Sequence, residues 1–391
     1  MERLHSNQRT VDTLPRPSGK YVVGVTYLSF VDVKRKEMFD SQRESPRELT
    51  VKVWYPADQP FDGEPYLLEA EATFATKYLQ FPARFKDLKT NAGRDVPVAS
   101  REDRYPVLIF SHGWGEHYAQ NTILMEELAS HGYIVFSLSH HYECKFTSYP
   151  DGRLIHIEMD NPRLQKMMNE QMHPKAMTLF ETLQNATGDE ERVQVFQEMS
   201  MTLPMVLTES PAYWAEDIAF LMDQLNIMDG GDGCFHKKMD LDRIGVFGMS
   251  LGGLATSVIS STDRRIKAAV NMDGGLSTAS LDVEYEMPFM FFNSQRYLGC
   301  GPLFLRQTRQ DGYSLSVRGA GHYNFSDYSV YPVPSIQFLL GPIDGDRMID
   351  MMNGIIRAFF DKYLKQEPEI DILKIAQKYE EIDIVTHIES Q

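Results

Sequence analysis

The sequence predicts an α/β protein with a mostly parallel central sheet and helices on both faces. Two observations lead to this prediction. Residues 105–115 and 133–141 begin with unbroken apolar runs, which are typical of parallel strands that are buried on both faces. Residues 121–132 lie between these runs and have apolar spacing that suits a helix, and strand–helix–strand units of this kind build parallel sheets.

Size and charge exclude several classes of protein. A chain of 391 residues is compatible with one large α/β domain that carries an insertion, or with two domains. The formal net charge of −16, with no block of Lys or Arg, argues against a nucleic-acid partner, because such binding depends on neutralised phosphates. The chain contains no run of 18 apolar residues, so a membrane-spanning helix is not expected.

The cysteines and the N-terminus bear on location. The three cysteines are widely spaced and form no metal-binding motif, which fits a reducing compartment and predicts no metal site. The polar start of the chain shows no signal peptide, so we expect a cytoplasmic protein. A secreted mature form that has lost its signal would look the same.

The first part of the chain opens with β structure. Residues 1–20 are polar and predict a loose N-terminal arm. Residues 21–33 and 47–58 are rich in β-forming residues and predict a pair of antiparallel strands.

The strand–helix pattern recurs after residue 210. The predicted helices are 212–226, 251–261 and 345–366, and the predicted strands are 243–250, 266–274, 288–294 and the start of 313–322. Residues 371–390 predict a short helix followed by a tail. The predicted core therefore comprises residues 21–144 and 211–391.

Residues 145–210 interrupt this pattern and predict a helical insertion, or cap, over one end of the sheet. Pro162, Pro174 and Pro204 divide the segment into short helical pieces. The segment is rich in methionine, with Met167, Met168, Met172, Met177, Met199, Met201 and Met205. Methionine is flexible and fills irregular spaces, so we favour packing of the cap onto the body. A surface that faces substrate or lipid is the alternative.

The stretch "GVFGMSLGG" (245–253) places a serine between a predicted strand and a predicted helix. It contains the pattern G-x-S-x-G, and this context is the one that a nucleophile elbow requires. Gly248 and Gly252 are expected to be glycines because a Cβ would strike the neighbouring elements. Ser250 is therefore the candidate nucleophile, although a tight turn with an inert serine is the simpler alternative.

A serine nucleophile needs a base, which in doubly wound hydrolases follows the serine and an acid along the chain. After residue 230 the histidines are His236, His322 and His387. His236 precedes the serine and His387 lies in the tail. His322 directly follows the strand that starts at residue 313, so it is the candidate base.

The acid is expected at the end of another strand. The strand 288–294 ends in Asn293 and Ser294 and offers no carboxylate. The preceding strand ends in Asp273, beside glycines that permit a tight turn at the same sheet edge. Asp273 is our choice, with Asp311 and Asp327 as the alternatives.

An oxyanion formed during acyl transfer needs preset hydrogen-bond donors, usually backbone amides. The amide of Leu251, directly after the serine, is one candidate. The loop "SHGWG" (111–115) supplies the other, the amide of Trp114. His112 in this loop is expected to support the structure and to transfer no proton.

Six stretches together resemble one family. They are "FSHGWG" (110–115), "LASHGYIV" (128–135), "DRIGVFGMSLGG" (242–253), "NMDGG" (271–275), "PFMFFNS" (288–294) and "RGAGHYNFSDY" (318–328). In order and spacing they resemble the platelet-activating-factor acetylhydrolases of the plasma type, the group VII phospholipases A2. The resemblance covers roughly residues 15–365. It implies an α/β-hydrolase fold and a calcium-independent serine esterase with no cofactor.

The resemblance also implies residue roles and a substrate class. Ser250, Asp273 and His322 match the family's triad, and Trp114 and Leu251 match its amide donors. Trp114 replaces a smaller apolar residue, so the acyl pocket is expected to differ. The implied substrates are short-chain acyl esters, including phospholipids with a short or oxidised sn-2 chain, met through transient contact with a lipid surface.

Three other functions stay open from the sequence. They are a general carboxylesterase, a peptidase or dienelactone-type hydrolase, and a noncatalytic module that binds a ligand or a partner. The filled triad positions argue against the last.

Overall fold

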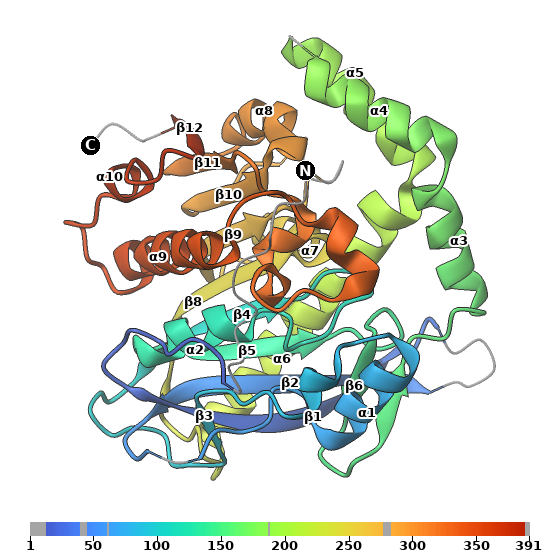
Figure 1. Ribbon diagram of the computed structural model, residues 1–391. Helices are drawn as coiled ribbons and strands as arrows, with labels where there is room; N and C mark the ends of the chain where they lie inside the picture. The colour runs from blue at the N-terminus through green and yellow to red at the C-terminus, as the bar shows by residue number, and fades with distance from the viewer. Residues whose placement is uncertain (1–12, 40–44, 61, 187, 277–282, 388–391) are drawn as a thin grey trace, which may run out of the picture.

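A computed structural model describes residues 13–39, 45–60, 62–186, 188–276 and 283–387. Within these residues a ten-stranded sheet runs through the molecule in the order β12-β11-β10-β9-β8-β4-β5-β2-β1-β3 (Figure 1). Six neighbouring strands, from β11 to β5 in this order, are parallel to one another. The predicted fold class, an α/β-hydrolase fold with a mostly parallel sheet, is confirmed.

The strands of this sheet are β1 (Val22–Lys36), β2 (Pro46–Ala57), β3 (Ala92–Arg94), β4 (Tyr105–Ser111), β5 (Ile134–Ser139), β8 (Met239–Met249), β9 (Ile266–Met272), β10 (Phe289–Ser294), β11 (Gly312–Val317) and β12 (Ile382–His387). β1 and β2 pair antiparallel, as predicted, and β2 joins the parallel part through β5.

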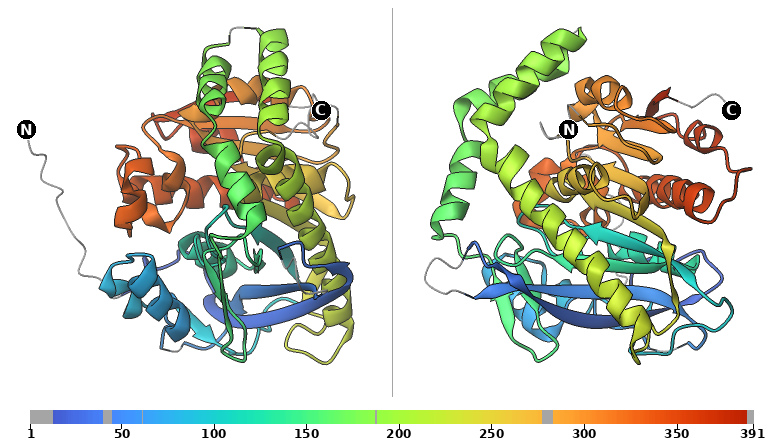
Figure 2. Two further views of the ribbon diagram at one scale, coloured as in Figure 1. Left: turned by 90° about the vertical axis from the view of Figure 1, so that its right-hand side faces the viewer. Right: turned by 180° about the vertical axis from the view of Figure 1, so that it is seen from behind.

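Helices cover both faces of the sheet. α2 (Thr122–Ser130) and α9 (Gly345–Leu364) lie on one face, and α6 (Ser210–Gly230) and α7 (Leu251–Ser260) lie on the other (Figure 2). Each face has its own hydrophobic core. Val107 and Ile109 of β4 enter the α6–α7 core, whereas Leu108 and Phe110 enter the α2–α9 core. Burial on both faces explains why residues 105–110 of β4 form an unbroken apolar run.

The shorter helices lie at the periphery of the sheet. They are α1 (Glu69–Tyr78), α8 (Gly301–Leu305) and α10 (Ile372–Ala376), with short 3₁₀ or π segments at Ala83–Lys86, Met205–Glu209, Gln295–Cys300, His322–Phe325, Asp327–Ser329 and Pro334–Leu339. No helix in the described ranges is both long and apolar enough to cross a membrane.

The 145–210 segment begins with a hairpin of β6 (Phe146–Ser148) and β7 (Leu154–His156), which the sequence analysis did not predict. Three helices follow, α3 (Pro162–Gln171), α4 (Pro174–Asn185) and α5 (Asp189–Thr202), and they arch beside the sheet (Figure 1). Pro162 and Pro174 start α3 and α4, where the missing N–H costs nothing. The π turn at Met205–Glu209 joins the arch to α6.

The two ends of the chain differ from the prediction. Residues 1–12 of the predicted arm lie outside the described residues, but residues 13–20 pack against the body. Leu14 is buried, and the Ser18 hydroxyl donates to Glu127 of α2. The predicted tail contains β12, which pairs antiparallel with β11 at the sheet edge. The edge of β11 is open to pairing, and the antiparallel strand β12 occupies it.

Candidate active site

Ser250 occupies a strained turn between β8 and α7. Its backbone angles are φ 57° and ψ −121°, in the half of the map that side chains rarely adopt. A Cβ on Gly248 would lie 2.3 Å from the Gly252 carbonyl oxygen, and one on Gly252 would lie 2.0 Å from that of Ser111. Both contacts are prohibitive, so the turn requires glycine on each side of the serine.

The structure brings the three predicted side chains together. The Nε2 atom of His322 lies 3.0 Å from Ser250 Oγ, and its Nδ1 atom lies 2.6 Å from Asp273 Oδ2. Asp273 is fully buried, whereas the His322 side chain is 18% exposed. These distances are within hydrogen-bond range, so a proton can pass from the hydroxyl to the imidazole.

Asp273 makes hydrogen bonds to Ser294 at the end of β10, the strand that offers no carboxylate. Its Oδ1 atom accepts hydrogen bonds from the Ser294 amide at 2.7 Å and the Ser294 hydroxyl at 2.8 Å. The Asn271 side chain accepts from the Gly274 amide at 2.9 Å and donates to the Gly275 carbonyl at 3.0 Å, which fixes the turn. Ser294 was not predicted as a hydrogen-bond partner of Asp273, although its place at the end of a neighbouring strand is a usable signal.

The His322 loop is fixed independently of the triad. The Asn324 Oδ1 atom accepts from the amides of Gly321 at 2.8 Å and Gly341 at 2.7 Å. Asp327 does not orient His322; its carboxylate accepts from the Ile123 amide at the start of α2.

The other alternative acid, Asp311, also lies away from the candidate triad. It accepts a hydrogen bond of 2.5 Å from the Tyr363 hydroxyl of α9. Among the three acids considered, Asp273 is therefore the one that contacts the histidine.

The loop after β4 lies against the elbow. A Cβ on Gly113 would be 3.3 Å from Ser250 Cβ, so the two backbones are close neighbours. The amide of Gly113 donates to Gln120 Oε1, that of Gly115 to the Glu143 carbonyl, and that of Glu116 to the Gly113 carbonyl. Within the described residues the Trp114 amide donates no hydrogen bond, so it is available to a substrate.

Leu251 is the first residue of α7. The first amides of a helix have no partner within the helix, and the helix dipole favours negative charge there. The Leu251 amide therefore lies where negative charge is favoured, directly after Ser250.

A small pocket of about 80 Å³, partly open to solvent, lies beside Ser250. The core contributes Trp114, Ser250, Leu251, Leu254, Gly274, Gly275, Leu276 and Cys300, and the insertion contributes Met167, Gln171, Phe180, Leu183, Phe196, Met199, Val206 and Leu207. The walls are almost entirely apolar. Burial raises the pKa of Cys300 to about 12, so its thiol is neutral at pH 7 and does not compete with Ser250 as a nucleophile.

The methionines of the insertion differ in their exposure, and Met168 is half-buried. Met167, Met199 and Met205 are buried, and the first two line the pocket. Met172, Met177 and Met201 are 77%, 70% and 77% exposed. Packing onto the body therefore accounts for only part of the methionine content.

The part of the chain that the structure describes contains no group of three or more His, Cys, Asp or Glu side chains placed to hold a metal ion.

The family described as "Platelet-activating factor acetylhydrolase, isoform II" matches residues 6–381 of the sequence. The chain belongs to this family. Platelet-activating factor acetylhydrolase of Cavia porcellus is 24% identical over 372 residues, which cover 92% of this chain and 80% of the relative. A probable 1-alkyl-2-acetylglycerophosphocholine esterase of Arthroderma benhamiae is 22% identical over 410 residues, covering 94% of this chain and 92% of the relative.

A solved structure supports the same fold. The ferulic acid esterase of Streptomyces cinnamoneus superposes with a TM-score of 0.70 at 21% identity, over 95% of this chain and 99% of that one. Membership of the acetylhydrolase family makes the chain an enzyme that hydrolyses ester bonds, and it confirms the resemblance read from the six sequence stretches.

Proposed function

We propose that this acetylhydrolase-family enzyme hydrolyses short acyl esters through a covalent Ser250 intermediate, with phospholipids that carry a short sn-2 acyl chain as the preferred substrates. The observation that carries the proposal is the continuous line of hydrogen bonds from Ser250 Oγ through His322 to Asp273. The names of the relatives, an acetylhydrolase and an alkyl-acetylglycerophosphocholine esterase, support the substrate class.

In the first step His322 Nε2 takes the proton of Ser250 as Oγ attacks the ester carbonyl carbon. The carbonyl oxygen becomes an oxyanion, which accepts hydrogen bonds from the amides of Trp114 and Leu251. Asp273 keeps the other imidazole proton on Nδ1 and stabilises the imidazolium. Collapse of the intermediate breaks the ester C–O bond, and His322 gives its proton to the leaving alcohol.

In the second step His322 removes a proton from water, and the hydroxide attacks the acyl carbon on Ser250. The same amides stabilise the second oxyanion. Collapse breaks the bond to Oγ, returns the proton from His322 to Ser250 and releases the carboxylic acid. This chemistry requires no metal or organic cofactor.

The substrate class is tested with purified protein and two substrate sets. We expect 1-alkyl-2-acetylglycerophosphocholine to be hydrolysed at equal rates with calcium and with a chelator, and p-nitrophenyl esters to be favoured at acetyl over decanoyl. A kcat/KM for the phospholipid that is far below that for p-nitrophenyl acetate would instead support a general carboxylesterase on small soluble esters. Preference for decanoyl would contradict the short-acyl proposal.

Trp114 is expected to limit acyl length through its side chain, because the indole lines the pocket beside Ser250. Trp114→Ala keeps the backbone amide and enlarges the pocket, so the preference for hexanoyl over acetyl ester should rise by about tenfold. The measurement is kcat/KM on both esters. Met172→Ala, a change at an exposed position of the insertion outside the pocket lining, is the control and should leave the ratio unchanged. An unchanged ratio in Trp114→Ala would show that another wall sets the length limit.

We also propose transient contact with a lipid surface. Support comes from the exposed Met172, Met177 and Met201 of the insertion, and from Phe338, which is 79% exposed in the segment after the His322 loop. Activity on the phospholipid with and without phosphatidylcholine vesicles tests this contact. We further propose a cytoplasmic location. The proposal is based on the three cysteines, which are free thiols. Cell fractionation tests it.

A further inference from the structure

A second serine–histidine–aspartate line lies behind the loop that carries Trp114. Ser111 Oγ lies 2.7 Å from His140 Nε2, and His140 Nδ1 lies 2.8 Å from Asp217 Oδ2. All three side chains are fully buried, and none of them lines the described pocket beside Ser250. Substrate cannot reach this hydroxyl, so the line is not a second catalytic site.

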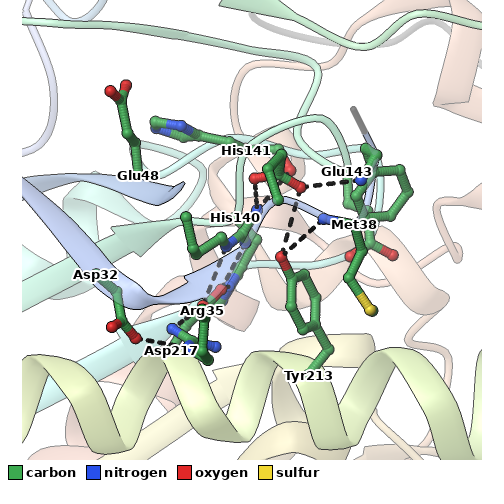
Figure 3. Close-up of polar contacts among 12 residues, drawn as sticks. Asp32, Arg35, Met38, Glu48, His140, His141, Glu143, Tyr213 and Asp217 are labelled. Carbon is green, nitrogen blue, oxygen red and sulfur yellow. Dashed lines mark hydrogen bonds and ion pairs between the residues drawn. The ribbon is translucent and has the colours of Figure 1, made fainter. Parts of the chain in front are cut away.

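Two arginine side chains stabilise the negative charge of Asp217, the last member of this line. The fully buried Arg47 donates to Asp217 Oδ2 at 2.6 Å, and Arg35 donates to Asp217 Oδ1 at 2.8 Å. Figure 3 shows Asp217 on α6 facing Arg35 and His140. Burial alone would raise the pKa of Asp217, but Arg47 and the hydrogen bonds to the carboxylate hold this pKa well below its usual range. Asp217 is therefore an anion that only accepts hydrogen bonds.

The anion determines which nitrogen of His140 carries the proton. Burial lowers the pKa of His140 to about 4, so the ring is neutral at pH 7. Its single proton must lie on Nδ1, facing Asp217, which leaves Nε2 to accept the Ser111 hydroxyl proton. The ring is also stacked on Trp214, with a centroid distance of 3.8 Å and an interplanar angle of 8°.

His140 makes hydrogen bonds to two successive residues, Ser111 and His112, at the start of the loop 111–115. Its ring accepts from Ser111, and its backbone amide donates to His112 Nε2 at 3.1 Å. His112 Nδ1 in turn donates to the Gly113 carbonyl at 2.7 Å. The next residue is Trp114, so these bonds set the path of the backbone that presents its amide.

Glu143, three residues after His140, contacts the other end of the loop 111–115 through its backbone and contacts α6 through its side chain. The carbonyl of Glu143 accepts from the Gly115 amide at 2.8 Å. Its side chain accepts from Trp214 Nε1 at 2.6 Å and from the Ser210 hydroxyl at 2.9 Å. Ser210, Trp214 and Asp217 lie on α6 at spacings of four and three residues, which place them on one face of the helix.

We propose that His140 is a positioning residue of the oxyanion site: by joining Ser111 and His112 to Asp217 on α6, it holds the Trp114 amide where the tetrahedral oxyanion forms. The inference rests on the proposed function of Ser250 and the Trp114 amide. It assigns His140 an effect on the transition state and none on substrate binding, because the ring touches neither the pocket nor the triad.

His140→Phe tests the proposal, since phenylalanine keeps the stack on Trp214 and the backbone amide but loses both ring hydrogen bonds. We expect kcat to fall by about 10- to 100-fold, because loss of a whole oxyanion donor costs about 10²- to 10³-fold. KM should stay unchanged. The affinity for a trifluoromethyl ketone, which forms an oxyanion on Ser250, should fall by the same factor as kcat.

His141→Phe is the matched control. His141 is the adjacent buried histidine, but its ring lies near Thr50 Oγ1 at 3.2 Å and the Tyr149 hydroxyl at 3.3 Å, away from the loop. Its kcat and ketone affinity should match those of the wild type. If His141→Phe and His140→Phe lower both quantities equally, the effect is general damage to the core and the proposal is wrong.

Ser111→Ala decides the matter if His140→Phe does not fold. It removes one hydroxyl, and kcat and ketone affinity should fall together by a smaller factor. Wild-type kcat and ketone affinity in the folded variants would overturn the role of His140 and leave the proposed function intact. Failure of the proposed function itself has a different signature, which is unchanged turnover in Ser250→Ala.

Discussion

Replacing Ser250 by alanine should lower kcat for ester hydrolysis on the order of 10⁶-fold, since serine enzymes that lose the nucleophile suffer losses of this size. The change removes only Oγ. The positive φ of 57° is strained for alanine as it is for serine, so the elbow gains no relief and the fold should be unchanged. Initial-rate assays on p-nitrophenyl acetate measure the loss.

Thermal unfolding and pocket occupancy are the controls for this prediction. Ser250→Ala should unfold at the wild-type temperature and should still bind a carboxylic acid product. A variant that is folded and retains more than a small fraction of the wild-type kcat would show that another group attacks the ester.

Replacing Asp273 by asparagine should lower kcat by about 10⁴-fold, because the wrong tautomer of His322 would be stabilised. The amide of Ser294 can only donate, so the oxygen of the new side chain must face Ser294 and its NH₂ group must face His322. Nδ1 would then have to accept, which places the imidazole proton on Nε2. That nitrogen could no longer accept the proton of Ser250.

Asparagine suits this test because it tolerates the φ of 50° at position 273 and has the size of aspartate. Asp311→Asn is the matched control, since Asp311 contacts Tyr363 and lies outside the triad. Its kcat should equal that of the wild type. If kcat falls equally in the two variants, or falls in Asp311→Asn alone, Asp273 does not have the proposed role.

The fold was predictable where burial imposes a local pattern. Residues 105–110 of β4 and 244–249 of β8 contribute alternate side chains to the two cores. These stretches are therefore continuously apolar, and this pattern is visible without any partner strand. β12 was not predicted although Ile382 and Ile384 alternate with polar residues, because so short an alternation does not distinguish an edge strand from a loop. The hairpin of β6 and β7 was missed because three-residue strands give too short a pattern.

The site was predictable to the extent that strand ends determine it. Ser250 and Asp273 follow neighbouring parallel strands, and such strands bring their ends to one edge of the sheet. The Arg47–Asp217 pair joins residues 170 positions apart, and no local pattern specifies such a contact. A polar run begins at His140, directly after the apolar strand β5. This run was a usable signal for a buried polar network at that strand end.

The central claim is that the environment of one serine makes its hydroxyl a nucleophile. The most direct measurement is mass spectrometry of peptides from the protein after reaction with a fluorophosphonate. We expect one adduct per chain, on the peptide that contains Ser250, with labelling abolished in Ser250→Ala and strongly slowed in Asp273→Asn. An adduct on a different residue, or full ester hydrolysis by a protein that the probe does not label, would contradict the account.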